Sequence, residues 1–298
     1  MNKKFVVWLI LCLIWGSTWL FIKIGLRDLP PISFAALRFG LAAIILWGIV
    51  WYRKAQPPKN RRDWMTLFWS AMLGFSINYS LIFWGEAYIS SGLAAVLQSM
   101  IPAFGLIMAH WFLPAEKITM RKFLGVAVGI GGVALIFSDQ FQLANKMALA
   151  GSAALLGSAF FVSASNILIK SRGVHLDPVV TSATQMSMGA IPMFLVGFLW
   201  EGNPANFHWS RASFLALVYL VVFGSVAAFT LYYWLLKHWD VTKAGMISLV
   251  TPVIAVALGM VTLHEQLTWQ IAVGTILIIG GITTIMGEEI LPQRKALS

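Results

Sequence analysis

Charge is scarce in this 298-residue sequence: Asp, Glu, Lys and Arg together make up 11% of it, and only 11 residues are acidic. A soluble domain carries about 25% charged residues. The deficit, together with 59% hydrophobic residues and a mean hydropathy of +0.81, excludes an ordinary soluble protein and predicts an integral membrane protein. The net charge of +10 is therefore not a sign of nucleic-acid binding, since basic residues in membrane proteins mark cytoplasmic loops.

Cysteine and catalytic motifs are also nearly missing. The single cysteine, Cys12, excludes an intrachain disulfide. No H-x-x-x-H, G-x-S-x-G or D-x-D pattern occurs, and the apolar stretches lack clustered carboxylates. An intramembrane enzyme or a metal site needs such clusters, so we expect no enzyme activity, no metal and no cofactor. No A-x-A-like site follows the first apolar stretch before Arg27, so that stretch is predicted to stay as an anchor.

Long apolar runs fill the chain. A membrane-spanning helix needs about 20 mostly apolar residues, and short polar links separate the runs. The sequence predicts an all-α protein with ten transmembrane helices, over residues 5–24, 33–51, 64–84, 91–113, 121–138, 147–169, 178–199, 211–235, 242–262 and 269–287.

The basic residues orient these spans. With a cytoplasmic N-terminus, three basic residues fall outside (Arg27, Lys146 and Arg211) and two fall within spans (Lys23 and Arg38), while the other 16 of the 21 face the cytoplasm. This asymmetry obeys the positive-inside rule. Both termini are therefore predicted to be cytoplasmic.

Two stretches about 150 residues apart share one design, a small-residue apolar helix with an internal proline. They are residues 88–105, with Pro102, and residues 241–259, with Pro252. A proline removes a backbone donor and frees a carbonyl, which is tolerated at membrane depth where neighbours or a water-filled cavity satisfy it. Paired weakened helices of this kind mark the site of a secondary transporter; the alternative is that both prolines are packing kinks.

The repeat extends beyond the prolines. Trp84 matches Trp234, Glu116-Lys117-Ile118-Thr119 matches Glu265-Gln266-Leu267-Thr268, and Gly131-Gly132 matches Gly280-Gly281, all at offsets of 149 or 150. We divide the chain into repeats over residues 1–140 and 141–298. Each holds five spans, an odd number, so the second enters the membrane from the opposite side and the two form an inverted-topology repeat.

These features resemble the ten-span EamA-type members of the drug/metabolite transporter superfamily. The residues that carry the resemblance are Trp15-Gly16-Ser17, Lys23, Leu37-Arg38-Phe39, Ala87-Tyr88-Ile89, Pro102 and the Glu-x-x-Thr plus glycine pattern before spans 5 and 10. The second half departs from the pattern, because span 6 reads Phe161-Val162-Ser163 and Gln185 stands where the first half has Arg38.

The resemblance implies two five-helix bundles around a central cavity lined by spans 1, 3, 4, 6, 8 and 9, with alternating access. It also implies a bacterial inner-membrane protein, monomeric or homodimeric, that exports amino acids or related small metabolites. Its partners are then the lipid bilayer and a small-molecule substrate, with no nucleic acid.

Candidate substrate-binding residues are the polar and aromatic side chains within those spans and the charge at position 38, because amides, hydroxyls and aromatic rings fix small polar molecules. They are Ser17, Trp19, Arg38, Asn78, Tyr79, Gln98, Ser163, Asn166, Tyr232, Tyr233, Ser248 and Thr251, with Pro102 and Pro252 as hinges. Each polar residue has an alternative interpretation as interhelical glue.

Charged residues near the spans have structural alternatives too. For Arg38 the alternatives are recruitment of a carboxylate-bearing substrate and a structural role as a bridge to helix ends. Lys23 is expected to snorkel to the interface. Glu86 is expected to be an acid in an interfacial loop rather than a site for a proton or a cation. Two other functions stay open: a channel-like facilitator and proton-coupled efflux of organic cations or drugs. The scarcity of buried carboxylates favours facilitated exchange or weak coupling.

Overall fold

The computed structural model describes residues 3–89, 91–136, 138, 146–203, 206–254 and 268–290, and within these ranges the chain forms helices and no strand. The helices are α1 (Lys3–Gly25), α2 (Pro31–Tyr52), α3 (Arg61–Ala71), η1 (Met72–Ile77), α4 (Asn78–Tyr88), α5 (Ser91–Gln98), α6 (Ile101–Phe112), α7 (Met120–Ile136), α8 (Lys146–Leu168), η3 (Ile169–Gly173), α9 (Pro178–Trp200), α10 (Arg211–Val221), η5 (Val222–Ala227), α11 (Ala228–His238), α12 (Val241–Gly245) and α14 (Trp269–Ile290).

Helical segments overlap every predicted span. Seven helices of the described residues are long and apolar enough to cross a membrane, and shorter apolar helices cover Val96–Phe112 and Val241–Ile254. The last part of the predicted span 242–262 lies outside the described residues. The chain is thus a multi-pass helical membrane protein.

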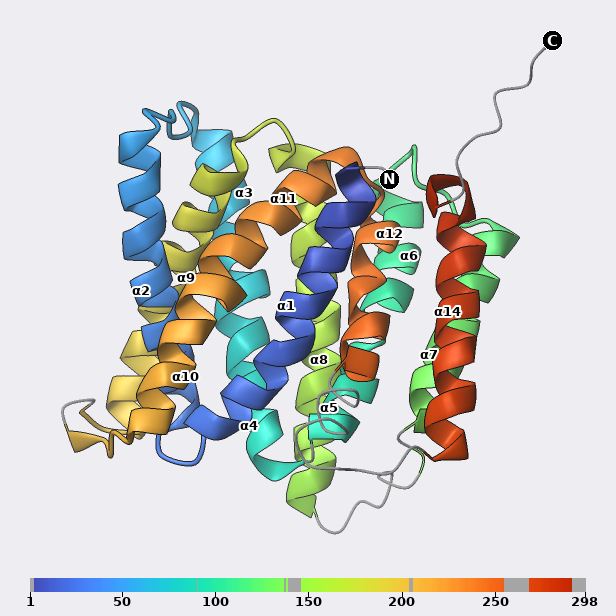
Figure 1. Ribbon diagram of the computed structural model, residues 1–298. Coiled ribbons are helices and arrows are strands. Elements are labelled where there is room, and N and C mark those ends of the chain that lie inside the picture. Colours follow the sequence, from blue (N-terminus) through green and yellow to red (C-terminus); the bar gives the residue numbers. More distant parts are fainter. Residues whose placement is uncertain are drawn as a thin grey trace.

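The helices stand side by side, with α2 and α9 at one edge, α7 and α14 at the other, and α1, α8 and α12 between them (Figure 1). Glycines bring α7 and α14 into backbone contact. A methyl group added at Gly281 would lie 2.5 Å from the carbonyl oxygen of Gly125, and one at Gly274 would lie 2.6 Å from that of Gly132. Small residues allow this approach in membranes.

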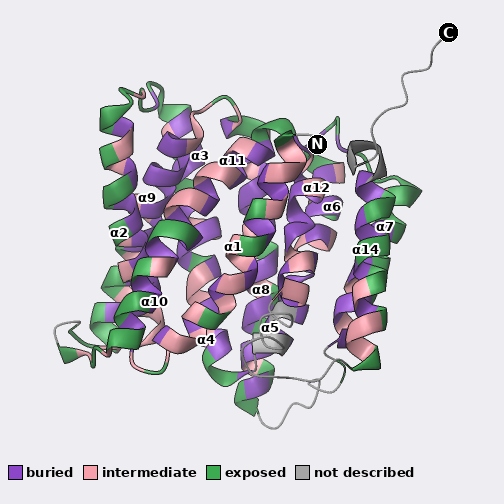
Figure 2. Ribbon diagram, viewed as in Figure 1, coloured by how far each residue is buried: buried purple, intermediate pink, exposed green. Residues whose placement is uncertain are grey.

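The outer surface is apolar. Large hydrophobic side chains are exposed along the outer helices, among them Ile44 on α2, Leu195 on α9, Phe123 on α7 and Ile276 on α14. Figure 2 shows the buried residues concentrated in the interior and the exposed ones on the outer helices. Soluble proteins rarely expose so much contiguous apolar surface to water, whereas the lipid tails of a membrane cover such a surface.

Two π-helical segments occupy matched places in the two halves. The run α3–η1–α4 and the run α10–η5–α11 have the same boundaries at an offset of 150, so that Met72–Ile77 corresponds to Val222–Ala227. Where continuous α-helices were expected, each run carries an extra-wide turn, and such turns are frequent at functional sites.

Two lysines are also matched. The ammonium of Lys23, at the end of α1, donates to the carbonyl oxygens of Glu86 (3.0 Å) and Ile89 (3.4 Å) at the end of α4. Lys170 does the same at the end of α11, donating to Leu236 (2.7 Å) and Trp239 (2.8 Å). Cations stabilise helix C-termini. The ammonium of Lys23 is thus held by orphan carbonyls of another helix, and its snorkelling to the interface stays a prediction.

Two glutamates also differ from expectation. Glu86 was expected in an interfacial loop, but it lies in α4 with its side chain fully buried. The Glu-x-x-Thr pattern places Glu116 just before span 5, yet its carboxylate accepts the backbone N–H of Val241 at 2.8 Å and so caps α12. The start of α7 is capped by Thr119, whose hydroxyl accepts from the N–H of Lys122 at 3.2 Å. Glu265 lies outside the described residues.

The proline helix of span 4 is broken. α5 ends at Gln98, and α6 begins at Ile101 with Pro102 in its first turn, where a missing N–H costs nothing. In the second half a turn at Met246 separates α12 from a helical run over residues 247–254 that contains Pro252. The N–H groups of Ser99 and Leu249, which correspond at an offset of 150, both bond three residues back, at 3.1 Å.

Candidate functional site

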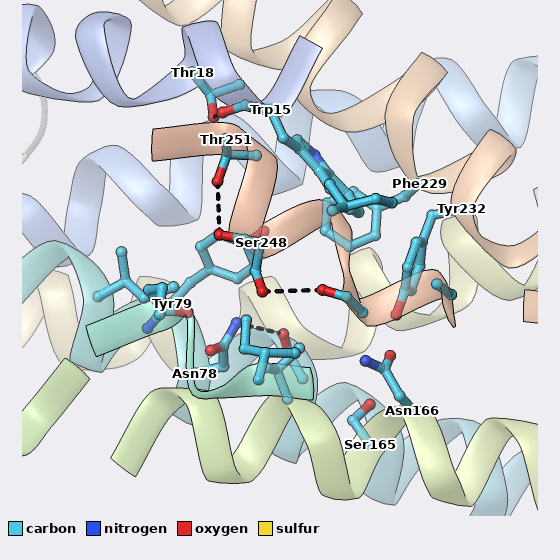
Figure 3. Close-up of a pocket in the computed structure, with 18 of the residues that line it drawn as sticks. Trp15, Thr18, Asn78, Tyr79, Ser165, Asn166, Phe229, Tyr232, Ser248 and Thr251 are labelled. Atoms are coloured by element: carbon cyan, nitrogen blue, oxygen red, sulfur yellow. Dashed lines mark hydrogen bonds between the residues drawn. The ribbon is translucent and has the colours of Figure 1, made fainter. Parts of the chain in front are cut away.

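A cavity with a volume of about 130 Å³ lies in the middle of the molecule. Its walls come from α1, η1, α4, the α5–α6 break, α8, α11, α12 and the run after it, with one side chain from α2. Its lining residues are Trp15, Thr18, Trp19, Ile22, Arg38, Gly74, Asn78, Tyr79, Ile82, Gln98, Ile101, Val162, Ser165, Asn166, Phe229, Tyr232, Tyr233, Ala244, Gly245, Ile247, Ser248 and Thr251. Figure 3 shows most of these side chains.

The structure brings most of the predicted site residues together. The ones at the cavity are Trp19, Arg38, Asn78, Tyr79, Gln98, Asn166, Tyr232, Tyr233, Ser248 and Thr251. Ser17 and Ser163 are not there. Ser17 faces α10, where its hydroxyl lies 2.6 Å from that of Tyr219, and the buried Ser163 donates to the carbonyl oxygens of Ile101 (3.2 Å) and Ala159 (2.7 Å).

Helical periodicity explains why these two serines miss the cavity. On α1 the lining residues are Trp15, Thr18, Trp19 and Ile22, spaced i, i+3, i+4 and i+7, so they form one face of the helix. Ser17 points away from that face. On α8 the same spacing selects Val162, Ser165 and Asn166 and excludes Ser163.

Aromatic rings form one wall. The ring of Trp15 lies 5.4 Å from that of Phe229 and 5.1 Å from that of Tyr232, centre to centre. The indole N–H of Trp15 donates to the carbonyl oxygen of Gly224 in η5 at 3.3 Å. Trp15 and Phe229 were not among the predicted binding residues. The α1 periodicity identifies Trp15, whereas nothing in the sequence distinguishes Phe229 from other phenylalanines.

Amides form the facing wall. Asn78 donates to the carbonyl oxygen of Gly74 at 3.1 Å, while its buried side-chain oxygen has no partner among the described residues. Gln98 donates to the carbonyl oxygen of Leu155 at 3.0 Å. Asn166 also lines the cavity, and its side-chain amide carries both donors and an acceptor (Figure 3).

Arg38 supplies the only charge among the lining residues. Its side chain is 1% exposed and donates from Nε to the hydroxyl of Ser225 at 2.9 Å and from Nη2 to the carbonyl oxygen of Gly224 at 3.0 Å. Its guanidinium also lies 5.4 Å from the ring centre of Tyr79. Arg38 is thus both a bridge to η5 and a buried positive charge beside the cavity, and its recruitment of a carboxylate stays a prediction.

Pro102 and Pro252 do not line the cavity themselves, but each affects a carbonyl of a residue that does. A helical residue normally donates to the carbonyl four positions earlier, so Pro102 cannot donate to the carbonyl of Gln98, and Pro252 cannot donate to that of Ser248. Gln98 and Ser248 both line the cavity. The hydroxyl of Thr251 donates to the Ser248 carbonyl oxygen at 3.3 Å (Figure 3). A methyl group on Gly245 would lie 3.5 Å from the Cα of Pro102, so the two proline helices meet there.

The described residues hold no group of three or more His, Cys, Asp or Glu side chains that fits a metal ion. The lining residues offer amides, hydroxyls, aromatic faces and one positive charge, which can hold a small polar molecule. A multi-pass helical membrane protein with such a cavity between its helices belongs, as a class, with the transporters.

Comparison with known proteins defines the family. The profile of the EamA-like transporter family matches residues 3–138 and again residues 149–287, and the chain belongs to this family. It is 28% identical over 91% of its length to "Uncharacterized transporter YoaV" of Bacillus subtilis (strain 168), covering 92% of that protein. It is 26% identical over 94% of its length to "Probable amino-acid metabolite efflux pump" of Escherichia coli (strain K12), covering 94% of that protein.

A solved crystal structure of another protein has the same fold, with a TM-score of 0.79 at 18% identity, over 95% of this chain and 96% of that one. The family and its relatives are transporters and not enzymes. The protein is a membrane transporter.

Proposed function

We propose that this transporter exports amino acids or related small metabolites by alternating access through the central cavity. The observation that carries the proposal is the composition of the cavity wall. Aromatic rings face amides and hydroxyls, and Arg38 is the only charged lining residue. A zwitterionic molecule with an apolar side group complements such a wall, because its carboxylate approaches the guanidinium and its apolar part the rings.

The architecture we propose is ten spans in two inverted-topology repeats, residues 1–140 and 141–298. Three observations support it: the π-helical segments at an offset of 150, the paired lysines at the ends of α4 and α11, and two successive matches to one family profile. In alternating access, the two repeats move relative to each other so that the cavity opens first to one side of the membrane and then to the other. The basic-residue asymmetry supports an inner-membrane location with both termini cytoplasmic.

The name of the Escherichia coli relative supports amino-acid metabolites as the substrate class. Organic cations fit less well, because no carboxylate of the described residues lines the cavity and the charge of Arg38 repels them. A channel shares the fold but not the kinetics, because only a carrier exchanges labelled for unlabelled substrate with a transient overshoot.

The test is a counterflow panel in proteoliposomes loaded with amino acids, aromatic metabolites or organic cations, with and without a pH gradient. The expected result is counterflow with at least one carboxylate-bearing amino acid or metabolite and none with the cations. Flux without counterflow supports the channel, and counterflow restricted to cations supports drug efflux; both contradict the proposal.

A further inference from the structure

One buried acid stands apart from the cavity lining. Glu86 is 0% exposed, and neither oxygen of its carboxylate has a hydrogen-bond partner among the residues that the structure describes. Burying an ionised carboxylate without partners costs several kcal/mol, so such a group is normally paired, hydrogen-bonded or protonated. No side chain in the described part of the surrounding packing gives Glu86 a structural hydrogen bond to make.

The position of Glu86 continues the cavity. On α4 the lining residues are Asn78, Tyr79 and Ile82, and Glu86 follows Ile82 by four residues, on the same helix face. Four residues rise about 6 Å along a helix. The carboxyl group therefore lies one turn beyond the cavity, toward the membrane face at which α1 and α4 end.

A single charge faces Glu86 from the neighbouring helices. The ammonium of Lys23 on α1 acts on it electrostatically but donates to the main-chain oxygens of Glu86 and Ile89, not to the carboxylate. Around this end of α4, α2 contributes Phe34 against Phe83, and α8 contributes uncharged atoms of Gly151 and Leu155 against Gly85. Lys23 is thus in place to balance the ionised form when water reaches the site.

The second half shows that the fold itself does not need an acid here. At the offset of 150 the counterpart of Glu86 is Leu236, which is 1% exposed. The main-chain oxygen of Leu236 accepts from Lys170 at 2.7 Å, just as that of Glu86 accepts from Lys23 at 3.0 Å. The same helix end is therefore built with leucine in one half and with an acid in the other, so packing does not account for the carboxyl group.

We propose that Glu86 is a proton-binding site that couples transport to the proton gradient, an inference that rests on the proposed function. A water-borne proton binds a carboxylate oxygen of Glu86 when the protein opens on the side where α1 ends, and closure buries the neutral acid as seen here. Opening on the other side hydrates the group through the cavity and returns the proton to water. Substrate leaves by the route through which the proton enters, which makes the cycle an antiport.

The test compares wild type with Glu86→Gln, which keeps the shape of the neutral acid, and with Glu86→Leu, which copies the second half. Glu116→Gln is the control, since Glu116 is a buried acid with a hydrogen-bonded role. Substrate counterflow without a pH gradient is expected in all four proteins. Accumulation driven by a pH gradient is expected in wild type and Glu116→Gln, and to fall to the level without a gradient in both Glu86 variants.

A second readout needs no substrate. The infrared spectrum of the purified wild type at neutral pH should contain a band from a protonated carboxylic acid that is lost in Glu86→Gln and retained in Glu116→Gln. Accumulation by Glu86→Gln equal to that of wild type, or an unchanged infrared band, overturns the proposal. Absence of counterflow in wild type with every compound of the panel would instead be a failure of the proposed function, and the infrared comparison would still decide whether Glu86 holds a proton.

Discussion

Nε of Arg38 on α2 donates to the hydroxyl of Ser225 in η5 at 2.9 Å, joining residues 187 positions apart. The bond anchors a buried charge at the cavity edge, and it allows the structural and binding roles of Arg38 to be tested separately. Arg38→Gln removes the charge, whereas Ser225→Ala removes one hydrogen bond and leaves the charge in place.

We expect Arg38→Gln to raise the half-saturation constant for carboxylate-bearing substrates by at least about tenfold, since a hydrogen bond to a charged group contributes about 1.5–3 kcal/mol. Ser225→Ala should lower the thermal unfolding midpoint in detergent with affinity unchanged. Substrate affinity and the thermal unfolding midpoint, both measured on Arg38→Gln and Ser225→Ala, distinguish a binding role of Arg38 from a structural one. Equal losses of stability with no change in affinity would make Arg38 purely structural.

The proline helices are expected to set the rate of turnover. Alanine at position 102 restores an N–H that can bond to the carbonyl of Gln98 and so join α5 to α6. Alanine at position 252 restores an N–H that can bond to the carbonyl of Ser248 and removes a proline from within a helical run, where it costs about 3 kcal/mol. Pro102→Ala and Pro252→Ala should therefore slow counterflow by about tenfold or more with substrate affinity unchanged, because the binding side chains remain. Wild-type turnover in both variants would identify the prolines as packing features.

Glu116 gives the protein a pH-dependent stability. Burial raises the pKa of its carboxyl group above the ordinary value of 4.5, although the hydrogen bond from Val241 opposes this. A raised pKa means that the folded protein binds the proton more tightly than the unfolded chain, so the stabilisation is present in acid and is lost as pH rises from 4.5 through the raised pKa.

Glu116→Gln keeps an acceptor for Val241 but does not titrate. Its thermal midpoint should decline less than that of wild type as the pH rises from about 4 to 7, the range above the ordinary glutamate pKa. Thermal unfolding of both proteins at several pH values provides the comparison. Parallel curves would show that the buried carboxyl group does not titrate with folding.

The proposed topology has its own test. In a background with the buried Cys12 replaced by serine, single cysteines at Ser138 and Asn206, both exposed, should react with a membrane-impermeant reagent from the periplasm. Cysteines at Gln56, also exposed, and Ser298 should react only after the membrane is permeabilised. Labelling of Ser138 from the cytoplasmic side would refute the ten-span arrangement.

The sequence predicts the helices well because apolar runs of about 20 residues have few alternatives. It predicts most of the polar lining residues because polar side chains within spans are rare. The prediction fails where the rotation of a helix about its axis decides which side chains face the cavity. Ser17 lies off the face that Trp15, Thr18 and Trp19 form on α1, and Ser163 lies off the lining face of α8. It also fails for contacts across the fold: no local pattern tells that Glu116 caps α12 or that Glu86 is buried without a partner.

The central claim, that the cavity is the substrate site of a carrier, is tested most directly by counterflow with Asn166→Ala and Ser163→Ala in proteoliposomes. The two residues lie three positions apart on α8, but only Asn166 lines the cavity, while Ser163 is bonded to Ile101 and Ala159. The account predicts a half-saturation constant raised about tenfold in Asn166→Ala, the effect of losing about 1.4 kcal/mol, and unchanged in Ser163→Ala. Equal effects of the two substitutions, or unchanged counterflow in Asn166→Ala, would contradict it.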